Sequence, residues 1–399
     1  MELKFVRCIV DEKKCRKCGF CIEVNSCHSP QRCSGCLSCY WACPYEARII
    51  VEDFSERKNV RITVNGVEHE VPEYVTVKQA LKLVGYSFPK EVGDFCETGG
   101  CWSCAVIING NLERSCITPI ANGMTIETDV ENVEPLRIIH GPQPHTVGGK
   151  ATPWSEKKKG RYVEVAIWTA GCNLRCPQCQ NYYITYDNVS SPLTPREAAK
   201  IMTYYRRIYR VNGLAVSGGE PTLNRRWLIQ YFKELNKLNP DPEARLHLDS
   251  NGTVLTPDYI DYLVEVGCNN IGVEPKGARI ETFMKITGIR DKELAERYLQ
   301  TSWNAVKYIA DNYAGRVYLG IGIPYNPALI SLEEVCEIGY RIASIDPEIQ
   351  VCVLDYFPTF RRRDIKRPPA THMVKIKKIL NEIGLKYVIV QTSMGHIGP

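Results

Sequence analysis

Three cysteines in the stretch Trp168–Cys179 constrain this chain more than any other feature. The stretch reads WTAGCNLRCPQC and spaces Cys172, Cys176 and Cys179 as C-x3-C-x2-C. Three thiolates can hold three irons of a [4Fe-4S] cluster and leave the fourth iron without a protein ligand. An iron with an open site can activate a small molecule, whereas a cluster with four thiolates mainly passes electrons. The alternative is a structural zinc site with a distant fourth ligand.

The chain holds 19 cysteines in 399 residues, most of them in C-x2-C and C-x4-C-x2-C groups. This grouping favours metal ligation over disulfides. The length predicts two or three domains. No apolar segment follows Met1, and no apolar run reaches the roughly 18 residues of a membrane span. We therefore expect a protein of a reducing, anaerobic cytoplasm with no membrane partner.

The formal net charge is +5, but bound clusters change this count. When oxidised, each four-thiolate cluster adds roughly −2 and a three-thiolate cluster roughly −1, which brings the total to about −2. A near-neutral holoprotein does not favour nucleic acid as a partner.

Two cysteine runs lie within residues 1–55. The second run, Cys33 to Cys43 followed by Pro44, resembles that of bacterial two-cluster ferredoxins, whose fourth cysteine ligates the other cluster. The resemblance implies a small α+β 2[4Fe-4S] domain. Its ligand sets would be Cys15, Cys18, Cys21 and Cys43 for one cluster, and Cys27, Cys33, Cys36 and Cys39 for the other. His28 in place of Cys27, and two zinc ions in place of the clusters, are alternatives. Cys8 lies outside both runs and is expected to be a buried thiol.

Residues 56–128 predict a second small domain. Alternating apolar residues flank an Asn65-Gly66 turn, which predicts a hairpin over Asn59–Val71, and Thr76–Val84 has helical spacing. The cysteines that follow have the plant-type [2Fe-2S] spacing, and they are Cys96, Cys101, Cys104 and Cys116. The segment resembles the [2Fe-2S] domains of succinate dehydrogenase iron–sulfur subunits and molybdenum hydroxylases, which implies a β-grasp fold. Trp102 stands where those families have glycine, and we expect a docking surface there.

Residues 129–160 are rich in proline and glycine and lack periodicity. They predict a linker in which His140 and His145 are exposed to solvent and the lysines near Glu156 form a solvated turn.

Residues 161–399 alternate between short apolar runs and helical patterns, which predicts an α/β domain with a parallel sheet. The predicted strands are 162–168, 214–216, 246–248, 271–273, 317–323 and 350–354. The predicted helices are 195–207, 224–238, 257–266, 292–312, 332–345 and 373–383. In βα barrels the active site lies at the C-terminal ends of the strands. Most of the motifs that carry chemistry follow these strands.

The three-cysteine motif, together with Ser217-Gly-Gly-Glu220-Pro221, resembles the radical SAM superfamily. The resemblance implies a partial (β/α)6 barrel whose open iron binds S-adenosylmethionine (SAM). By position it assigns the SAM-binding residues as Gly218, Gly219, Glu220, Asp249, Ser250, Asn251, Glu274, Lys276, Gly322 and Ile323. The match is greatest to the branch with pyruvate formate-lyase activating enzyme and the AmmeMemoRadiSam-type proteins, through Gly171–Asn181, Lys276-Gly277 and Phe357-Pro358. Gln178 departs from that branch, which usually has an aromatic residue there.

The resemblance implies a radical SAM enzyme with a fused electron relay, which forms a 5′-deoxyadenosyl radical that abstracts hydrogen from an unnamed substrate. The expected cofactors are three [4Fe-4S] clusters, one [2Fe-2S] cluster and SAM. The expected partners are a low-potential donor such as ferredoxin or flavodoxin, and a small-molecule or protein substrate. One alternative is an activase that generates a glycyl-type radical on a partner protein, which the N-terminal position of the extra clusters disfavours. Another is a non-catalytic electron carrier or redox sensor.

Two further groups of residues lie outside these motifs. Cys268, Cys336 and Cys352 are expected to be structural thiols. The Arg361–Arg363 run predicts a solvated loop or, alternatively, a site for an anionic group of the substrate.

Overall fold

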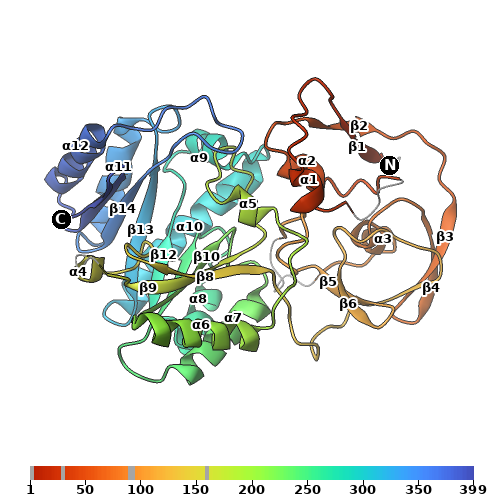
Figure 1. Ribbon diagram of the computed structural model, residues 1–399, viewed down its shortest axis with the longest axis horizontal. Helices are drawn as coiled ribbons and strands as arrows, with labels where there is room; N and C mark the ends of the chain where they lie inside the picture. The colour runs from red at the N-terminus through yellow and green to blue at the C-terminus, as the bar shows by residue number, and fades with distance from the viewer. Residues whose placement is uncertain (1–3, 28–31, 89–94, 158–160) are drawn as a thin grey trace.

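The computed structural model describes residues 4–27, 32–88, 95–157 and 161–399, and its strands form three sheets (Figure 1). A two-stranded sheet comes first in the chain, a five-stranded sheet second and a nine-stranded sheet last. Within the described residues, no helix combines the length and apolar character needed to cross a membrane.

The first part of the chain is a two-stranded antiparallel sheet with two short helices. β1 (Val6–Val10) pairs with β2 (Arg48–Glu52), and α1 (Phe20–Glu23) and α2 (Ser38–Ala42) lie between them in the sequence. Its small apolar cluster of Phe20, Val24 and Ala42 is completed by Tyr186 and Phe360 from the last part of the chain. The cysteine loops therefore form much of this part, and its apolar packing depends on the rest of the protein.

The second part is a five-stranded sheet with the order β4-β3-β7-β5-β6, on which α3 (Val77–Leu83) packs. Its strands are β3 (Asn59–Val64), β4 (Val67–Pro72), β5 (Ala105–Ile108), β6 (Asn111–Arg114) and β7 (Met124–Glu127). The β3–β4 hairpin forms where it was predicted, since Asn65 and Gly66 both have the positive φ of its tight turn, 49° and 82°. α3 begins after Thr76, whose side chain forms a reciprocal capping box with Gln79.

The third part is a nine-stranded sheet with the linear order β16 to β8. β9 through β15 run parallel, and β8 and β16 pair antiparallel at the two edges. Its strands are β8 (Ile139–His145), β9 (Glu164–Thr169), β10 (Gly213–Gly218), β11 (Arg245–Ser250), β12 (Asn270–Val273), β13 (Tyr318–Tyr325), β14 (Gln350–Asp355), β15 (Val388–Thr392) and β16 (Gly395–Ile397). This arrangement confirms the predicted α/β class.

The helices of the third part lie between these strands in the sequence. They are α4 (Trp154–Lys157), α5 (Tyr182–Thr185), α6 (Pro195–Tyr209), α7 (Arg225–Leu238), α8 (Pro257–Glu265), α9 (Ile280–Thr287), α10 (Lys292–Tyr313), α11 (Leu332–Ile345) and α12 (Ala370–Glu382). α6 and α8 both begin with a Thr-Pro pair, in which proline takes the first helical position. Trp227, Phe283 and Trp303 are buried from the helices into the same core as the strands.

Residues 129–157 are not a free linker, which corrects the prediction for this segment. β8 pairs with β9 at the sheet edge, and Arg137 is fully buried. His140 and His145 are also not free in solvent. His140 Nε2 lies 2.8 Å from the Asp187 carboxylate, and His145 Nδ1 lies 3.3 Å from the Glu164 carboxylate. The prolines concealed the strand from sequence reasoning, but an edge strand tolerates proline because it needs hydrogen bonds on one side only. Residues 158–160 of the predicted lysine turn lie outside the described residues.

The first part of the chain packs against both others. Ser38 Oγ donates to the Thr98 carbonyl at 3.1 Å, and Asn25 Nδ2 donates to the Tyr186 carbonyl at 2.9 Å. Arg361, expected in a solvated loop or an anion site, instead donates to the backbone carbonyls of Tyr40, Trp41 and Cys43. Its guanidinium therefore fastens the first part of the chain to the loop after β14.

Candidate functional site

A cavity of about 200 Å³ lies beside the C-terminal ends of β9 to β12 and β14. Cys172, Cys176 and Cys179 line it from the loop of residues 170–180, called here the Cys172 loop. The other predicted SAM contacts in its lining are Gly218, Gly219, Glu220, Asp249, Ser250, Asn251, Glu274 and Lys276. The structure thus brings together the residues at four predicted strand ends, as expected for parallel strands that end at one edge.

The three thiols of the Cys172 loop are crowded. Burial and the neighbouring Cys176 and Glu220 raise the pKa of Cys172, and burial raises the pKa of Cys176 to about 12. Three sulfurs in this environment become thiolates when a positive centre offsets their charge, so the donor set fits a metal cluster. Among the described residues, no three His, Cys, Asp or Glu side chains gather as ligands of one ion would.

Glycines and a buried carboxylate shape the wall after β10. Gly218 has a φ of +124°, and a side chain on Gly219 would lie 2.3 Å from the Gly171 carbonyl oxygen. Glu220 is 1% exposed, and its carboxylate accepts hydrogen bonds from Thr222, Ser250 and the Asn251 backbone at 2.6 to 3.0 Å. Glu220 therefore ties the turn after β10 to the turn after β11.

The turn after β11 carries a buried charge chain. His247 lies between Glu164 and Asp249, with 3.2 Å from a ring nitrogen to each carboxylate. Burial opposes the charge on His247, but the two carboxylates outweigh it and raise its pKa to about 9. Burial likewise opposes ionisation of Asp249, yet Lys150 and His247 hold its pKa to about 2. At neutral pH Glu164, His247 and Asp249 form a charged, paired network that reaches the cavity through Asp249.

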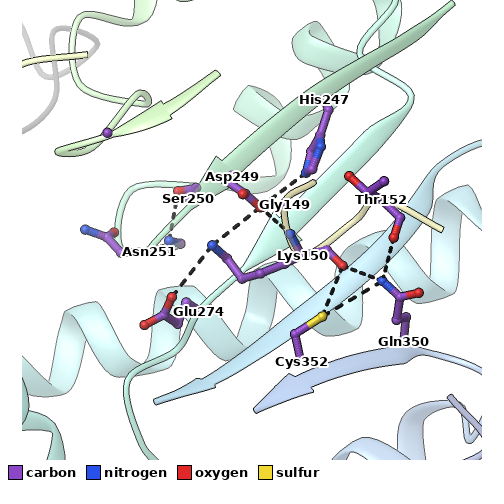
Figure 2. Close-up of polar contacts among 12 residues, drawn as sticks. Gly149, Lys150, Thr152, His247, Asp249, Ser250, Asn251, Glu274, Gln350 and Cys352 are labelled. Atoms are coloured by element: carbon purple, nitrogen blue, oxygen red, sulfur yellow. Dashed lines mark hydrogen bonds and ion pairs between the residues drawn. The ribbon is translucent and has the colours of Figure 1, made fainter. Parts of the chain in front are cut away.

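Lys150 is a site residue that the sequence analysis missed, because it lies in the segment predicted as a linker (Figure 2). Its Nζ lies 3.4 Å from Asp249 and 3.6 Å from Glu274. Its carbonyl accepts from Gln350 Nε2 at 2.7 Å, which holds the backbone against β14. Side chains at Gly320 and Gly322 of β13 would meet Lys150 atoms at 2.1 and 2.5 Å, so these glycines make room for it. In the sequence, only these two glycines could have indicated that Lys150 packs against β13.

Glu274 and Lys276 form a second pair at the cavity. Lys276 Nζ contacts Glu274 and donates to Tyr356 Oη at 2.9 Å, and Tyr356 Oη donates to Glu274 at 2.7 Å. Burial opposes ionisation of Glu274, but Lys276 and Lys150 hold its pKa to about 2. Gly322 and Ile323, also assigned to SAM, are buried in β13 and are not among the residues that line the cavity.

The four cysteines of the predicted [2Fe-2S] site are all buried. Cys96, Cys101 and Cys104 lie in the segment of residues 95–104, called here the Cys96 loop, and Cys116 follows β6. The backbone N–H groups of Thr98 and Cys101 each donate to Cys96 Sγ at 3.4 Å. Such donors stabilise thiolates around a cluster, so this donor set also fits. Trp102, expected at a docking surface, is buried against Ile138 and Ala170, where the second part of the chain meets the third.

The cysteines of the first part are more exposed, and Cys18 and Cys27 are the most open of them. Arg48 donates to Cys21 Sγ at 3.1 Å, and the Ala47 N–H donates to Cys43 Sγ at 3.3 Å. Cys15 is half-buried after β1, and His28 lies outside the described residues.

The second ligand run has an additional neighbour. The backbone N–H of Cys8 donates to Cys33 Sγ at 3.4 Å, and contact with the Cys39 thiol together with burial raises the pKa of Cys8. Burial raises the pKa of Cys36 to about 12. Cys8, expected to be a buried thiol, is half-buried on β1 and lies beside the second run. Cys268 and Cys352 are buried, as expected of structural thiols, and Cys336 is half-buried.

Comparison with known proteins matches two families. The radical SAM superfamily model matches residues 166–329, and a 2Fe-2S iron-sulfur cluster binding domain matches residues 57–131. The 7-carboxy-7-deazaguanine synthase of Hyperthermus butylicus is 27% identical over 45% of this chain and 77% of its own length. The probable GTP 3′,8-cyclase of Methanococcus aeolicus is 29% identical over 34% of this chain and 44% of its own. The structure of Streptococcus suis SuiB covers 60% of this chain and 52% of its own, with 13% identity and a TM-score of 0.44.

The chain therefore contains a radical SAM domain and a 2Fe-2S binding domain. The first implies a [4Fe-4S] cluster and SAM, and the second implies a [2Fe-2S] cluster. The chain spans less than half the length of the cyclase that it matches.

Proposed function

We propose that this protein cleaves SAM reductively in the cavity beside the Cys172 loop and uses its N-terminal thiolate sites as an electron relay. The observation that carries the proposal is that the three cysteines, Glu220 and Asp249 line one cavity. When bound there, the cluster and SAM supply a 5′-deoxyadenosyl radical that abstracts hydrogen from a substrate.

The residues of the cavity would bind and orient SAM. The backbone at Gly218 and Gly219 permits close approach of its amino-acid end, because neither residue has a side chain to obstruct it. Glu220 would hold the Ser250 turn in place and offer negative charge to the ammonium group. Asp249, fixed by Lys150 and His247, would accept hydrogen bonds from the ribose hydroxyl groups.

The charged pairs on the other wall would position the substrate. Lys276, Glu274 and Tyr356 form a hydrogen-bonded network next to Cys176. Such a buried network keeps its geometry because each member has a partner. A substrate that replaces one of these contacts would be held against SAM with little reorganisation.

The proposal extends to the whole chain. Residues 1–55 would hold two [4Fe-4S] clusters, residues 56–128 the [2Fe-2S] cluster, and residues 161–399 the third [4Fe-4S] cluster in a partial barrel. A low-potential ferredoxin or flavodoxin would supply the electrons. The similarity to the activating-enzyme branch keeps a protein substrate within this proposal.

The experiment that tests the proposal is anaerobic incubation of the reconstituted protein with SAM and a strong reductant. We expect 5′-deoxyadenosine and methionine in equal amounts. Reconstituted protein with its full iron content that yields no 5′-deoxyadenosine would refute the proposal and leave the electron carrier as the better account. Deuterium transfer into 5′-deoxyadenosine from labelled metabolites or labelled cell protein would then identify the substrate class.

A further inference from the structure

We propose that Arg175 and the paired glycines Gly100 and Gly171 form an electron-transfer contact between the Cys96 loop and the Cys172 loop. On this proposal, which rests on the proposed function, the [2Fe-2S] group is the direct redox neighbour of the SAM-binding cluster. It would exchange electrons with groups of the same chain and not with an outside protein.

The two loops touch through glycine backbone. A side chain on Gly171 would lie 2.6 Å from the Cys101 nitrogen and 3.0 Å from Cys96 Cβ. A side chain on Gly100 would lie 2.7 Å from the Gly171 nitrogen. Real Cβ atoms do not approach other atoms this closely, so both positions require glycine. Gly171 immediately precedes Cys172, so the ligands of the two sites are separated by little more than backbone.

Arg175 spans the same contact with one guanidinium group. Its Nη2 donates to the Cys96 carbonyl at 2.6 Å, and its Nη1 donates to the Cys172 carbonyl at 2.7 Å. Cys96 and Cys172 are predicted ligands of different sites. A positive charge shared between their carbonyls fixes the spacing of the loops and favours an added electron on either side.

The four ligands of the [2Fe-2S] site are shielded from solvent. Cys96, Cys101, Cys104 and Cys116 are at most 4% exposed. Cys36 of the first part of the chain packs against Cys104 and Cys116. On this proposal an electron reaches this site through the first part of the chain, where Cys18 is exposed to solvent.

A second contact joins the first part of the chain to the Cys172 loop and offers an alternative route for the electron. Arg361 donates to the carbonyl of Cys43, and its own backbone N–H donates to the Pro177 carbonyl at 2.9 Å. Phe20 and Tyr182 lie beside it with ring centroids 5.5 Å apart. Arg175 and Arg361 thus hold alternative routes to the same loop.

The proposed redox step transfers one electron along these sites. A low-potential one-electron protein carrier is oxidised outside and reduces a site of the first part. The electron then passes to the site of the Cys96 loop and on to that of the Cys172 loop. No bond is made or broken, and no proton moves before SAM is cleaved.

The test compares wild-type protein with Arg175→Met and its matched control Arg361→Met, each reconstituted anaerobically. Pulsed EPR on partly reduced samples would measure the magnetic coupling of the [2Fe-2S] signal to the cluster signal whose shape SAM changes. Stopped-flow reduction by a low-potential ferredoxin would measure the order in which the sites are reduced. Iron content and the individual EPR signals show whether each variant is folded and loaded.

We expect strong coupling in the wild type, and reduction of the Cys172-loop cluster by ferredoxin slowed at least about tenfold in Arg175→Met but not in Arg361→Met. If wild-type coupling is absent, or if only Arg361→Met slows that reduction, the proposal is overturned. If Arg175→Met does not bind its clusters, the EPR coupling measured in the wild type still tests the proposal. SAM cleavage driven by a chemical reductant separates the two proposals, because its loss in the wild type would refute the proposed function instead.

Discussion

The Cys172 loop and the Cys96 loop use the same local chemistry in opposite surroundings. In each, backbone N–H groups donate to a cysteine sulfur at 3.4 Å, from Leu174 to Cys172 and from Thr98 to Cys96. The Cys172 loop opens on a cavity lined by Lys150, Asp249 and Lys276. The cysteines of the Cys96 loop are buried, with neighbours from the first part of the chain and from the Cys172 loop.

On the proposed function, this difference in access adds to the difference between three and four thiolates in separating a reactive site from one that passes electrons. A cysteine set open to a charged cavity can place a small molecule against its metal. A set whose four cysteines are buried and all used as ligands offers no open position to a substrate and is suited to electron exchange. Four predictions test this contrast, beginning with the largest expected effect.

The triple variant Cys172→Ala, Cys176→Ala, Cys179→Ala should lose SAM cleavage completely with any reductant. Its [2Fe-2S] EPR signal should persist, because Cys96, Cys101, Cys104 and Cys116 are all unchanged. The matched double variant Cys96→Ala, Cys101→Ala should lose the [2Fe-2S] EPR signal. It should still cleave SAM when a chemical reductant supplies the electron. Cleavage by the first variant would place the chemistry elsewhere.

Lys150→Met should destabilise the protein by about 3 kcal/mol at neutral pH, because two buried carboxylates lose a cation. The pKa values of Asp249 and Glu274, both about 2, lie below their ordinary 3.8 and 4.5. Their stabilisation is therefore present above about pH 4.5 and is lost as the pH falls toward 2. The variant raises both pKa values, so its deficit in thermal unfolding should be constant from pH 8 to about 4.5 and should shrink as the pH falls from there toward 2.

The exposed pair of Lys307 with Asp311 supplies the control for this prediction. Lys307→Met should change stability by less than about 0.5 kcal/mol at any pH in this range. A pH-independent deficit in Lys150→Met would show that lost packing, and not lost charge, is responsible.

Glu220→Ala should weaken SAM binding about tenfold or more, while iron content stays unchanged. The effect has two sources, since Glu220 both faces the cavity and holds Ser250 and Asn251 through its carboxylate. Thr222→Val removes one donor to Glu220 and should have a smaller effect. Anaerobic equilibrium binding measures both, and an equal SAM affinity in wild type and Glu220→Ala would remove this residue from the site.

The smallest expected effect is a difference in stability between two variants of Trp102. Its side chain packs on Ile138 and Ala170, and its φ is +61°, in the left-handed region. Trp102→Gly and Trp102→Ala both lose the packing, but glycine adopts this φ without strain. Trp102→Gly should therefore be more stable than Trp102→Ala by about 1 kcal/mol in thermal unfolding. Equal stability would show that the backbone relaxes.

The sequence alone indicated the alternation of strands and helices after residue 161 and the cysteines of each ligand run. These features are local: apolar spacing sets a strand or helix, and ligands three residues apart share a loop. α11 occupies the predicted residues 332–345, and the hairpin turn falls at Asn65-Gly66. The motifs at Glu220, Asp249 and Glu274 were assigned to one site, because parallel strands end at one edge.

Only the tertiary structure placed Lys150 beneath the cavity, β8 at the sheet edge and Gly171 against Cys101. Each depends on residues far apart in the chain that meet after the sheet has formed. Lys150 enters because Gly320 and Gly322 leave space for it, and no pattern near Lys150 reports those glycines. The Cys96 loop meets the Cys172 loop because two glycines lack side chains at the same point, a complementarity of shape that periodicity and spacing do not encode.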